Sequence, residues 1–416
     1  MVYQCMSFTL DRERFINAMK IQADIGGTAN GGLHRLTLSD ADKKIRDWFC
    51  EEMEDAGLSV RVDEFGNIFG RREGTSSIEP VLVGSHLDSQ PYGGIYDGAL
   101  GTITALEFIR ELNDRNIETE RPIEIVNWTN EEGSRFQPTL QGSGVWAGVL
   151  DLEEQYATTD EEGVSVEAEL ERIGYKGEVP AEPREQYDSY LELHVEQGPY
   201  LEENGMDVGV VTGIVGLTWG AMTFHGEANH SGATPMHHRN DAMVGAADVI
   251  TQVRRIPNSL GDRTVGTVGF IDAKPNSINI VPEEVTLTYG FRDPDASILE
   301  QAKEEVLREA ENVAEREGLA WKHEDRAEAD PVLFPDRCVD AVEDAASELG
   351  YDSMRIFSGG VHDATHAHRV CDSGMVFAVS EDGKSHTEEE FTSWDDCYSA
   401  ANTLAGAALT LAKDEA

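Results

Sequence analysis

The stretch PVLVGSHLDSQPYGGIYDGALGTITALEFIRELNDR, residues 80–115, contains the pattern that decides the fold. Its apolar beginning is typical of a buried strand, and its second half, from GALG onward, has the apolar spacing and length of a helix. Another apolar run, PIEIVNWTN at residues 122–130, indicates a second strand. This strand–helix–strand order predicts an α/β fold, with a mixed sheet flanked by helices.

Three polar side chains lie between the first strand and the helix. His86 ends the strand, Asp88 follows two residues later, and Asp97 comes just before the helix. Because of their spacing, we expect His86 and Asp88 to point the same way, so that Asp88 accepts a hydrogen bond from a metal-binding imidazole. A structural interpretation is also open, in which Asp97 caps the helix and His86 is a loop histidine.

Other candidate ligands follow later strands. The adjacent Glu131 and Glu132 come after the strand PIEIVNW, His194 lies in the apolar run LELHV, and His386 lies in a polar loop after GMVFAVS. Neighbouring glutamates on a loop point differently, so one can bind a metal while the other holds a water. Each residue also has an ordinary explanation, as an exposed acid or a core histidine. Together they suit zinc or another divalent transition metal at the strand ends of the sheet.

A rival cluster occurs in GGVHDATHAHR. His362 and His366 are four residues apart, a spacing that can bind zinc on a helix, but the glutamate of the H-E-x-x-H motif is missing. We favour a different interpretation, in which Gly359 and Gly360 let the backbone approach a ligand closely, with His362 nearby.

The chain is long for one hydrophobic core, which predicts two domains. From about Val211 to Asp330 the helix–strand alternation gives way to successive β-rich runs and two long helices. We therefore expect a catalytic domain formed by residues 1–212 and 327–416, interrupted by an inserted α+β domain at residues 213–326.

The charge is strongly acidic, with 79 Asp and Glu against 33 Lys and Arg and a formal net charge of −46. This field argues against binding nucleic acid or anionic membranes. The acids are spread along the chain rather than confined to a tail, as in proteins adapted to concentrated salt; an unusually acidic protein of dilute media is the alternative.

The five scattered cysteines and the absence of a leader or membrane-spanning run predict a cytoplasmic protein without disulfides.

Seven motifs resemble the amidase, hydantoinase/carbamoylase family, within the aminoacylase and carboxypeptidase-like zinc metallohydrolases. In chain order they are GSHLDSQPYGGIYDGALG, NWTNEEGSRFQPTLQGSGVWAG, ELHVEQGPYLE, GIVG, GEANHSGATPM, FRDPD and SGGVHDA. The resemblance runs from about residue 10 to the C-terminus. It implies that the inserted domain dimerises and moves as a lid.

The resemblance also implies roles for individual residues. Two divalent metal ions per subunit, zinc or alternatively manganese, cobalt or nickel, would be bound by five ligands: His86, Asp97, Glu132, His194 and His386. Asp97 would bridge the ions, Glu131 would be the general base, and His230 would stabilise the oxyanion. Asn279 and Arg292 would bind a substrate carboxylate and Gln197 would contact the substrate, although Arg292 could instead pair with Asp293 or Asp295.

The implied activity is hydrolysis of the linear amide of an N-carbamoyl-L-amino acid, an anionic ureido substrate, to the amino acid, carbon dioxide and ammonia. Allantoate hydrolysis is the first alternative, and a dipeptidase or aminoacylase activity the second. A non-catalytic binding protein on the same scaffold would be expected to lack a ligand or the base, and all of them are present.

Overall fold

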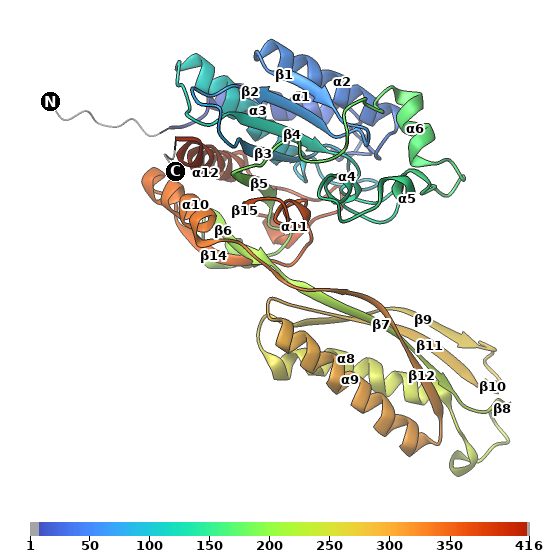
Figure 1. Cartoon of the computed structure of the whole chain (residues 1–416). Helices are drawn as coiled ribbons and strands as arrows, with labels where there is room; N and C mark the ends of the chain where they lie inside the picture. Colours follow the sequence, from blue (N-terminus) through green and yellow to red (C-terminus); the bar gives the residue numbers. More distant parts are fainter. Residues whose placement is uncertain (1–7, 414–416) are drawn as a thin grey trace. The chain divides into compact units, whose positions relative to one another are not determined.

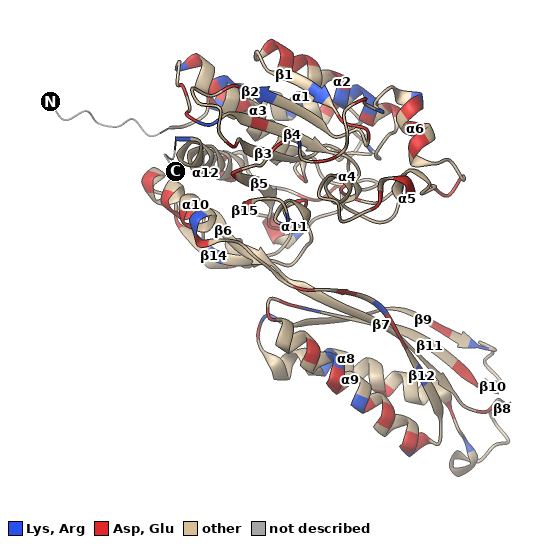
Figure 2. Cartoon of the chain, viewed as in Figure 1, with Lys and Arg blue, Asp and Glu red and all other residues tan. Residues whose placement is uncertain are grey.

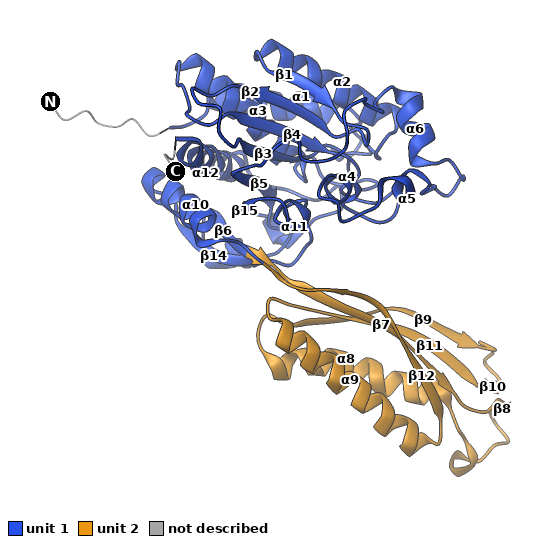
Figure 3. Cartoon of the chain, viewed as in Figure 1, with its two compact units in different colours: residues 1–212, 333–416 blue, residues 213–332 orange. Residues whose placement is uncertain are grey.

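The computed structural model describes residues 8–413 and divides into two compact units (Figure 3). The large unit consists of the chain up to Thr212 and from Leu333 onward, and the small unit is Gly213–Val332. The second boundary lies six residues beyond the expected residue 327. The reason is that strand β12 (Ala320–Ala329) remains paired with the small sheet up to Ala329, opposite Leu217.

The large unit is built on a mixed nine-stranded sheet, as the sequence predicted (Figure 1). Its strand order is β1-β2-β4-β3-β5-β15-β6-β13, with β14 beside β6. The four central strands β4, β3, β5 and β15 are parallel, whereas β1 with β2, β2 with β4 and β6 with β15 pair antiparallel. The strand bounds are β1 Ser59–Val62, β2 Ile68–Arg72, β3 Val81–His86, β4 Ile123–Trp128, β5 Ser189–Val195, β6 Val208–Ile214, β13 Val332–Leu333, β14 Ser353–Ser358 and β15 Asp372–Ala378.

Helices flank this sheet because they carry continuous apolar faces. Helix α3 (Ala99–Asp114) is buried along nearly its whole length and packs against β3, β4 and β5. Helices α10 and α12 pack against β15 and each other, while α2 packs against β1 and β2. The helix bounds of the unit are α1 Arg12–Asp24, α2 Asp40–Asp55, α4 Gln141–Trp146, α5 Leu152–Tyr156, α6 Val166–Ile173, α7 Tyr200–Asn204, α10 Asp336–Leu349, α11 Ala364–Ala367 and α12 Trp394–Lys413.

The small unit is a four-stranded antiparallel sheet with two long helices, of order β12-β7-β11-β9. Alternate residues of β11, from Val285 to Phe291, form its core with apolar residues of α8 and α9. A two-stranded ribbon, β8 with β10, completes it. The bounds are β7 Gly216–His225, β8 Asn229–His230, α8 Ala242–Leu260, β9 Val265–Lys274, β10 Ile280–Val281, β11 Glu284–Asp293 and α9 Ala296–Glu317.

Acidic side chains are distributed over both units rather than gathered in one segment. Figure 2 shows them along α2, α6 and α10 of the large unit and along α8 and α9 of the small unit. Among residues 8–413, no helix has the length and apolar character needed to cross a membrane.

Candidate metal centre

The parallel strands of the large sheet bring the candidate ligands to one edge. His86 is the last residue of β3, and His194 is the last but one of β5. Glu131 and Glu132 follow β4, Asp97 precedes α3, and His386 follows β15. Because β3, β4, β5 and β15 run parallel, their carboxyl ends meet at the same edge, where α/β sheets form sites.

His86, Asp97 and His194 form a first group of potential ligands, which we call position one. Oδ1 of Asp97 lies 3.3 Å from Nε2 of His86 and 3.1 Å from Nε2 of His194. All three side chains are buried. The other nitrogen of each ring contacts a backbone carbonyl oxygen at 3.0 Å. Nδ1 of His86 contacts the carbonyl of Asp88, and Nδ1 of His194 contacts the carbonyl of Val195. These contacts fix each ring with Nε2 facing Asp97, as in metal-binding histidines.

Asp97, Glu132 and His386 form a second group, which we call position two. Nε2 of His386 lies 3.5 Å from Oδ2 of Asp97 and 3.7 Å from Oε2 of Glu132. Gln197 donates from Nε2 to the same Oδ2 of Asp97 at 2.9 Å and lies 3.2 Å from Nε2 of His386. The two positions therefore share Asp97 and use different oxygens of it, an arrangement suited to a bridging carboxylate.

Glu131 lies beside both positions but belongs to neither group. Its Oε2 is 3.5 Å from Nε2 of His86. Burial raises the pKa of Glu131 well above the ordinary carboxyl value, and the nearby carboxylates of Asp363, Glu132 and Asp97 add to this effect. A buried carboxyl group of raised pKa next to a ligand cluster is well placed to exchange a proton.

Asp88 has a different role from the one expected from its spacing. It lies beyond the end of β3, and its carboxylate Oδ1 is 3.7 Å from Nδ1 of His86, which contacts the Asp88 backbone carbonyl instead. The carboxylate accepts hydrogen bonds from the backbone N–H groups of Glu131 at 3.3 Å and Glu132 at 3.4 Å. Asp88 thereby ties the loop after β3 to the loop after β4.

Gly98 explains how Asp97 comes so close to His86. Gly98 begins α3 with φ 62°, and no side chain caps the helix there. A Cβ atom on Gly98 would lie 2.3–2.4 Å from three atoms of the His86 ring. Asp97 is therefore not a helix cap: its carboxylate faces the histidines.

The side chains of these two groups, together with Glu131, are suited to binding a metal cation. Asp97, Glu131 and Glu132 are all buried, beside the histidines of the two groups of potential ligands. Nε2 of His86 faces two carboxylates and makes no well-directed hydrogen bond. Burial raises the pKa of Glu132, as it does that of Glu131. Buried charges of one sign are costly unless paired or bound to a metal, and the imidazole and carboxylate donors suit zinc and related ions.

The Gly359–Gly360 loop lies next to this centre. A Cβ atom on Gly360 would lie 2.9 Å from Oε1 of Gln197. The buried ring of His362 lies 4.4 Å, centroid to centroid, from that of His194, and its Nε2 is 2.8 Å from Oγ of Ser358. Burial lowers the pKa of His362 well below its ordinary value, so the ring is neutral. His366 lies on α11, and among the described residues neither it nor His362 belongs to a group of three or more potential ligands.

Two of the remaining predicted residues meet in the small unit. His230 on β8 pairs with Ile280 on β10, and the N–H of the adjacent Ser231 donates to the carbonyl of Asn279 at 3.1 Å. Nδ1 of His230 accepts N–H groups from Gly232 at 3.0 Å and Ala233 at 3.2 Å. When the ring is neutral, its proton must then be on Nε2, which is left as a hydrogen-bond donor.

Arg292 lies at the other end of β11. It pairs with Leu217 and Val265 on the neighbouring strands. The ribbon that carries His230 and Asn279 instead joins β11 at its first residue, Glu284. At about 3.3 Å per residue, the stretch from Glu284 to Arg292 is roughly 26 Å long. The structure therefore does not bring Asn279 and Arg292 together within one small unit.

Sequence reasoning missed two polar side chains that hold ligands. Gln90 donates from its backbone N–H to Oε1 of Glu132 at 2.9 Å and from Nε2 to Oε2 at 2.6 Å. Glu390 accepts the N–H of Asp97 at 3.2 Å and the hydroxyl of Ser385 at 2.8 Å. Gln90 lies within the motif GSHLDSQPYGGIYDGALG and Glu390 lies four residues after His386, but nothing in their spacing signals these contacts.

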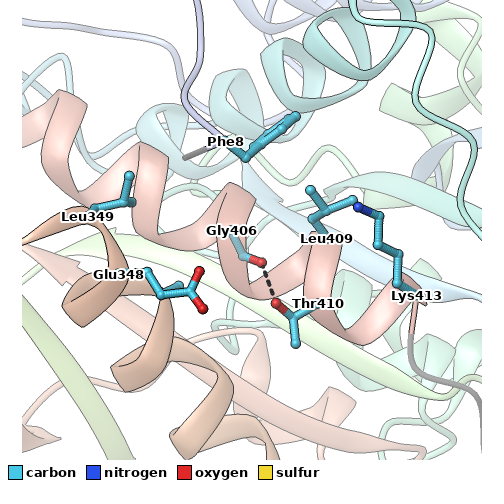
Figure 4. Close-up of a pocket in the computed structure, with 8 residues that line it drawn as sticks. Phe8, Glu348, Leu349, Gly406, Leu409, Thr410 and Lys413 are labelled. Carbon is cyan, nitrogen blue, oxygen red and sulfur yellow. Dashed lines mark hydrogen bonds between the residues drawn. The ribbon is translucent and has the colours of Figure 1, made fainter. Parts of the chain in front are cut away.

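A cavity of about 190 Å³ lies elsewhere in the large unit, between α10 and α12 (Figure 4). Leu349, Leu409 and Phe8 contribute apolar surface, and Glu348 and Lys413 lie at its edges. None of the candidate site residues lines it.

Comparison with known proteins identifies the family. Residues 82–410 match peptidase family M20/M25/M40. The chain is 40% identical to the N-carbamoyl-L-amino-acid amidohydrolase of Rhizobium meliloti, over 97% of each chain. It is 33% identical to the allantoate amidohydrolase of Bacillus subtilis, over 89% of this chain and 90% of that one. A crystal structure of an amidase of the hydantoinase/carbamoylase family from Burkholderia multivorans superposes with a TM-score of 0.94 at 42% identity, covering 98% of this chain and 99% of that one. The chain therefore belongs to peptidase family M20/M25/M40 and, within it, to the amidase, hydantoinase/carbamoylase family.

Proposed function

We propose that this protein is a metal-dependent N-carbamoyl-L-amino acid amidohydrolase. The observation that carries the proposal is the sharing of Asp97 between two ligand groups, with Glu131 beside them and outside both. The name of the 40% identical relative from Rhizobium meliloti supports the substrate class. We place the enzyme in the cytoplasm because its described cysteines, at positions 50, 338, 371 and 397, are all free.

Position one and position two would each hold one divalent ion, zinc in the first instance, with manganese, cobalt or nickel as alternatives. When bound, such ions polarise a carbonyl group and lower the pKa of a water molecule toward neutrality. The remaining chemistry belongs to the chain, and the donor set of three histidines and two carboxylates is consistent with these metals.

Glu131 would take a proton from the attacking water, whose oxygen adds to the ureido carbon. The charge that develops on the ureido oxygen would be stabilised by the Nε2–H of His230, whose Nδ1 is already occupied by backbone donors. Glu131 would then pass its proton to the leaving nitrogen as the bond to the amino acid breaks. The products are the free amino acid and carbamate, which decomposes to carbon dioxide and ammonia.

Substrate recognition would involve groups on several loops. The guanidinium of Arg292 can bind a carboxylate through two parallel hydrogen bonds, and Asn279 would add an amide donor. Gln197, Gly360 and His362 would line the site beside the metal positions, because Gln197 already contacts Asp97 and Gly360 lies against Gln197.

We further propose that the protein forms a twofold homodimer through the small unit. The family resemblance also implies that this unit moves as a lid. Strand β9 is an edge of the small sheet, and Val265, Phe270 and Ile271 on it are about half exposed. An unprotected apolar edge strand favours pairing with another strand. Antiparallel pairing of β9 with its copy would place the Val265 end, beside Arg292, next to the partner's Lys274 end, near Asn279. Residues from opposite ends of β11 could then serve one substrate.

The acidic composition supports a proposal about conditions: the enzyme works in concentrated salt. A net charge of −46 creates strong self-repulsion, which ions at molar concentration screen over about 3 Å.

Allantoate hydrolysis is the second candidate, because the chain also shares 33% identity with a relative named for that activity. A substrate panel at fixed metal and salt concentrations separates the two. We expect the highest kcat/KM for an N-carbamoyl-L-amino acid, measured by amino acid release. Faster turnover of allantoate, of N-acetyl amino acids or of dipeptides than of every N-carbamoyl compound would overturn the assignment.

A further inference from the structure

The three ligand histidines are held in two different ways. His86 and His194 are buried, and a backbone carbonyl contacts the Nδ1 atom of each. The side chain of His386 is 50% exposed, and its described contacts are all made through Nε2. Within residues 8–413, no hydrogen bond to Nδ1 orients this ring. The orientation of His386 must therefore depend on the loop that carries it.

That loop is attached to the Asp97 loop by Glu390. Oε1 of Glu390 accepts the backbone N–H of Asp97 at 3.2 Å, and Oε2 accepts the hydroxyl of Ser385, the residue before His386, at 2.8 Å. The side chain is 5% exposed, so these two hydrogen bonds form away from bulk water. One carboxylate thus links the backbone of a shared ligand to the neighbour of the exposed ligand.

The surrounding chain is shaped around this carboxylate. A Cβ atom on Gly94 would lie 2.1 Å from Oε1 of Glu390 and 2.3 Å from its carboxyl carbon. A side chain at position 94 would therefore displace Glu390. The same loop is closed at its base by the N–H of Glu381, which donates to the carbonyl of Phe391 at 2.9 Å.

We infer that Glu390 is a positioning residue for position two, which holds His386 at the distance from Asp97 and Glu132 that a metal ion requires. It acts through the neighbouring Ser385, whereas backbone carbonyls contact the rings of the two buried histidines directly. Position one shares Asp97 but depends on Glu390 less, because both of its histidines have their own carbonyl contacts. The inference rests on the proposed metal centre, but not on the identity of the substrate.

The test is calorimetric titration of the metal-free full-length protein with zinc. We expect two equivalents to bind wild-type protein. Loss of an outer hydrogen-bonding partner typically weakens metal binding about 10- to 100-fold. Glu390→Ala should weaken the second equivalent by that factor and the first, which shares only Asp97, by clearly less. Turnover of this variant should recover as zinc is added, with half-activation shifted by the same factor and KM unchanged.

Two further variants separate positioning from general damage. Glu390→Gln retains an acceptor for Asp97 and can donate to Ser385, so its second equivalent should bind within about threefold of wild type. Gly94→Ala leaves Glu390 in the sequence but displaces it, so it should reproduce the Glu390→Ala result. Glu389→Ala is the matched control: it removes an exposed carboxylate of the same loop, which pairs with Lys384 at 2.6 Å, and should bind zinc as wild type does.

The outcomes are distinguishable. If wild-type protein binds no metal, the proposed function itself fails. If wild-type protein binds two equivalents and both Glu390→Ala and Gly94→Ala bind them with wild-type affinity, the positioning role is overturned. Equal weakening of both equivalents, or the same loss in Glu389→Ala, would also overturn it.

Discussion

Gln90 holds both carboxylate oxygens of Glu132, one through its backbone N–H at 2.9 Å and the other through its side-chain amide at 2.6 Å. Glu131, the preceding residue, has no such clamp within residues 8–413, and its carboxylate faces His86 instead. Two adjacent residues of the same type are thereby given different environments. One is fixed in the place proposed for a ligand, and the other keeps a carboxylate that can exchange a proton.

Replacing each glutamate of this pair by glutamine should give opposite phenotypes. Glu131→Gln should retain both metal ions but lose turnover by about 10²- to 10⁴-fold, the usual contribution of a general base. Glu132→Gln should bind the second ion more weakly, because an amide is a poorer ligand than a carboxylate. Metal content after dialysis and kcat at saturating metal measure the two effects, and the reverse pattern would exchange the two roles.

Metal binding should release protons and become tighter as pH rises. Burial lowers the pKa of His86, but the carboxylates of Glu131, Asp97 and Asp88 outweigh it and raise that pKa well above its ordinary value. The pKa of His194 is also raised, by Asp97. Metals bind the neutral ring, so below the raised pKa values an ion entering position one must displace protons.

The stability of the metal-free protein has the opposite pH dependence: it should fall as pH rises. A histidine whose pKa is raised on folding stabilises the fold fully below its unfolded pKa of about 6.5, and this contribution disappears as pH rises through the raised value. Calorimetry in buffers of different ionisation enthalpy counts the released protons, and denaturant titration of metal-free protein follows stability. Zinc affinity that is constant between pH 6 and 8, with no proton release, would contradict this account.

Salt should raise both stability and the apparent affinity for an anionic substrate. The net charge of −46 repels the substrate and the protein's own acidic surfaces, over about 10 Å at 0.1 M salt but only about 3 Å at 1 M. KM should therefore fall as salt increases, until salt anions compete for Arg292. An amide-capped substrate analogue without the carboxylate is the control and should show a weaker dependence. Equal stability and KM at low and molar salt would be inconsistent with adaptation to concentrated salt.

Mixed dimers can show whether Arg292 and His230 act across subunits. Arg292→Ala should raise KM strongly for carboxylate substrates, and His230→Ala should lower kcat. If a site takes one of these residues from each subunit, a mixed dimer of the two variants contains one intact site. Random pairing then restores about a quarter of wild-type activity, because half of the dimers are mixed and each has one of its two sites. Differently tagged, co-expressed subunits allow the mixed dimer to be isolated; no recovery would mean that both residues act from the same subunit.

The sequence predicted those features that depend on local pattern. The strand ending at His86, the helix after Gly98 and the strand before Glu131 follow from apolar spacing, and the β-rich texture indicated the small unit. Contacts between distant residues could not be predicted in this way. Gln90 and Glu132 are 42 positions apart and Asp97 and Glu390 are 293 apart, so no periodicity connects them.

Closeness along the chain did not predict side-chain contacts either. Asn279 and Arg292 are near each other in sequence, yet the strand between them separates them in the small unit. Asp88 was expected to contact His86 through its carboxylate, and it does so through its carbonyl because the chain leaves the strand at His86. In both cases the path of the backbone, rather than residue type, determined the outcome.

Gly98 sets a limit on how this active-site loop can be redesigned. Because a Cβ atom there would run into the imidazole of His86, every other amino acid must displace the ligand before it can be accommodated. Variant libraries aimed at new side-chain specificity can therefore randomise exposed neighbours such as Tyr92, which is 59% exposed, while position 98 stays constant. Selection for a larger residue at position 98 would therefore act against the proposed metal position one.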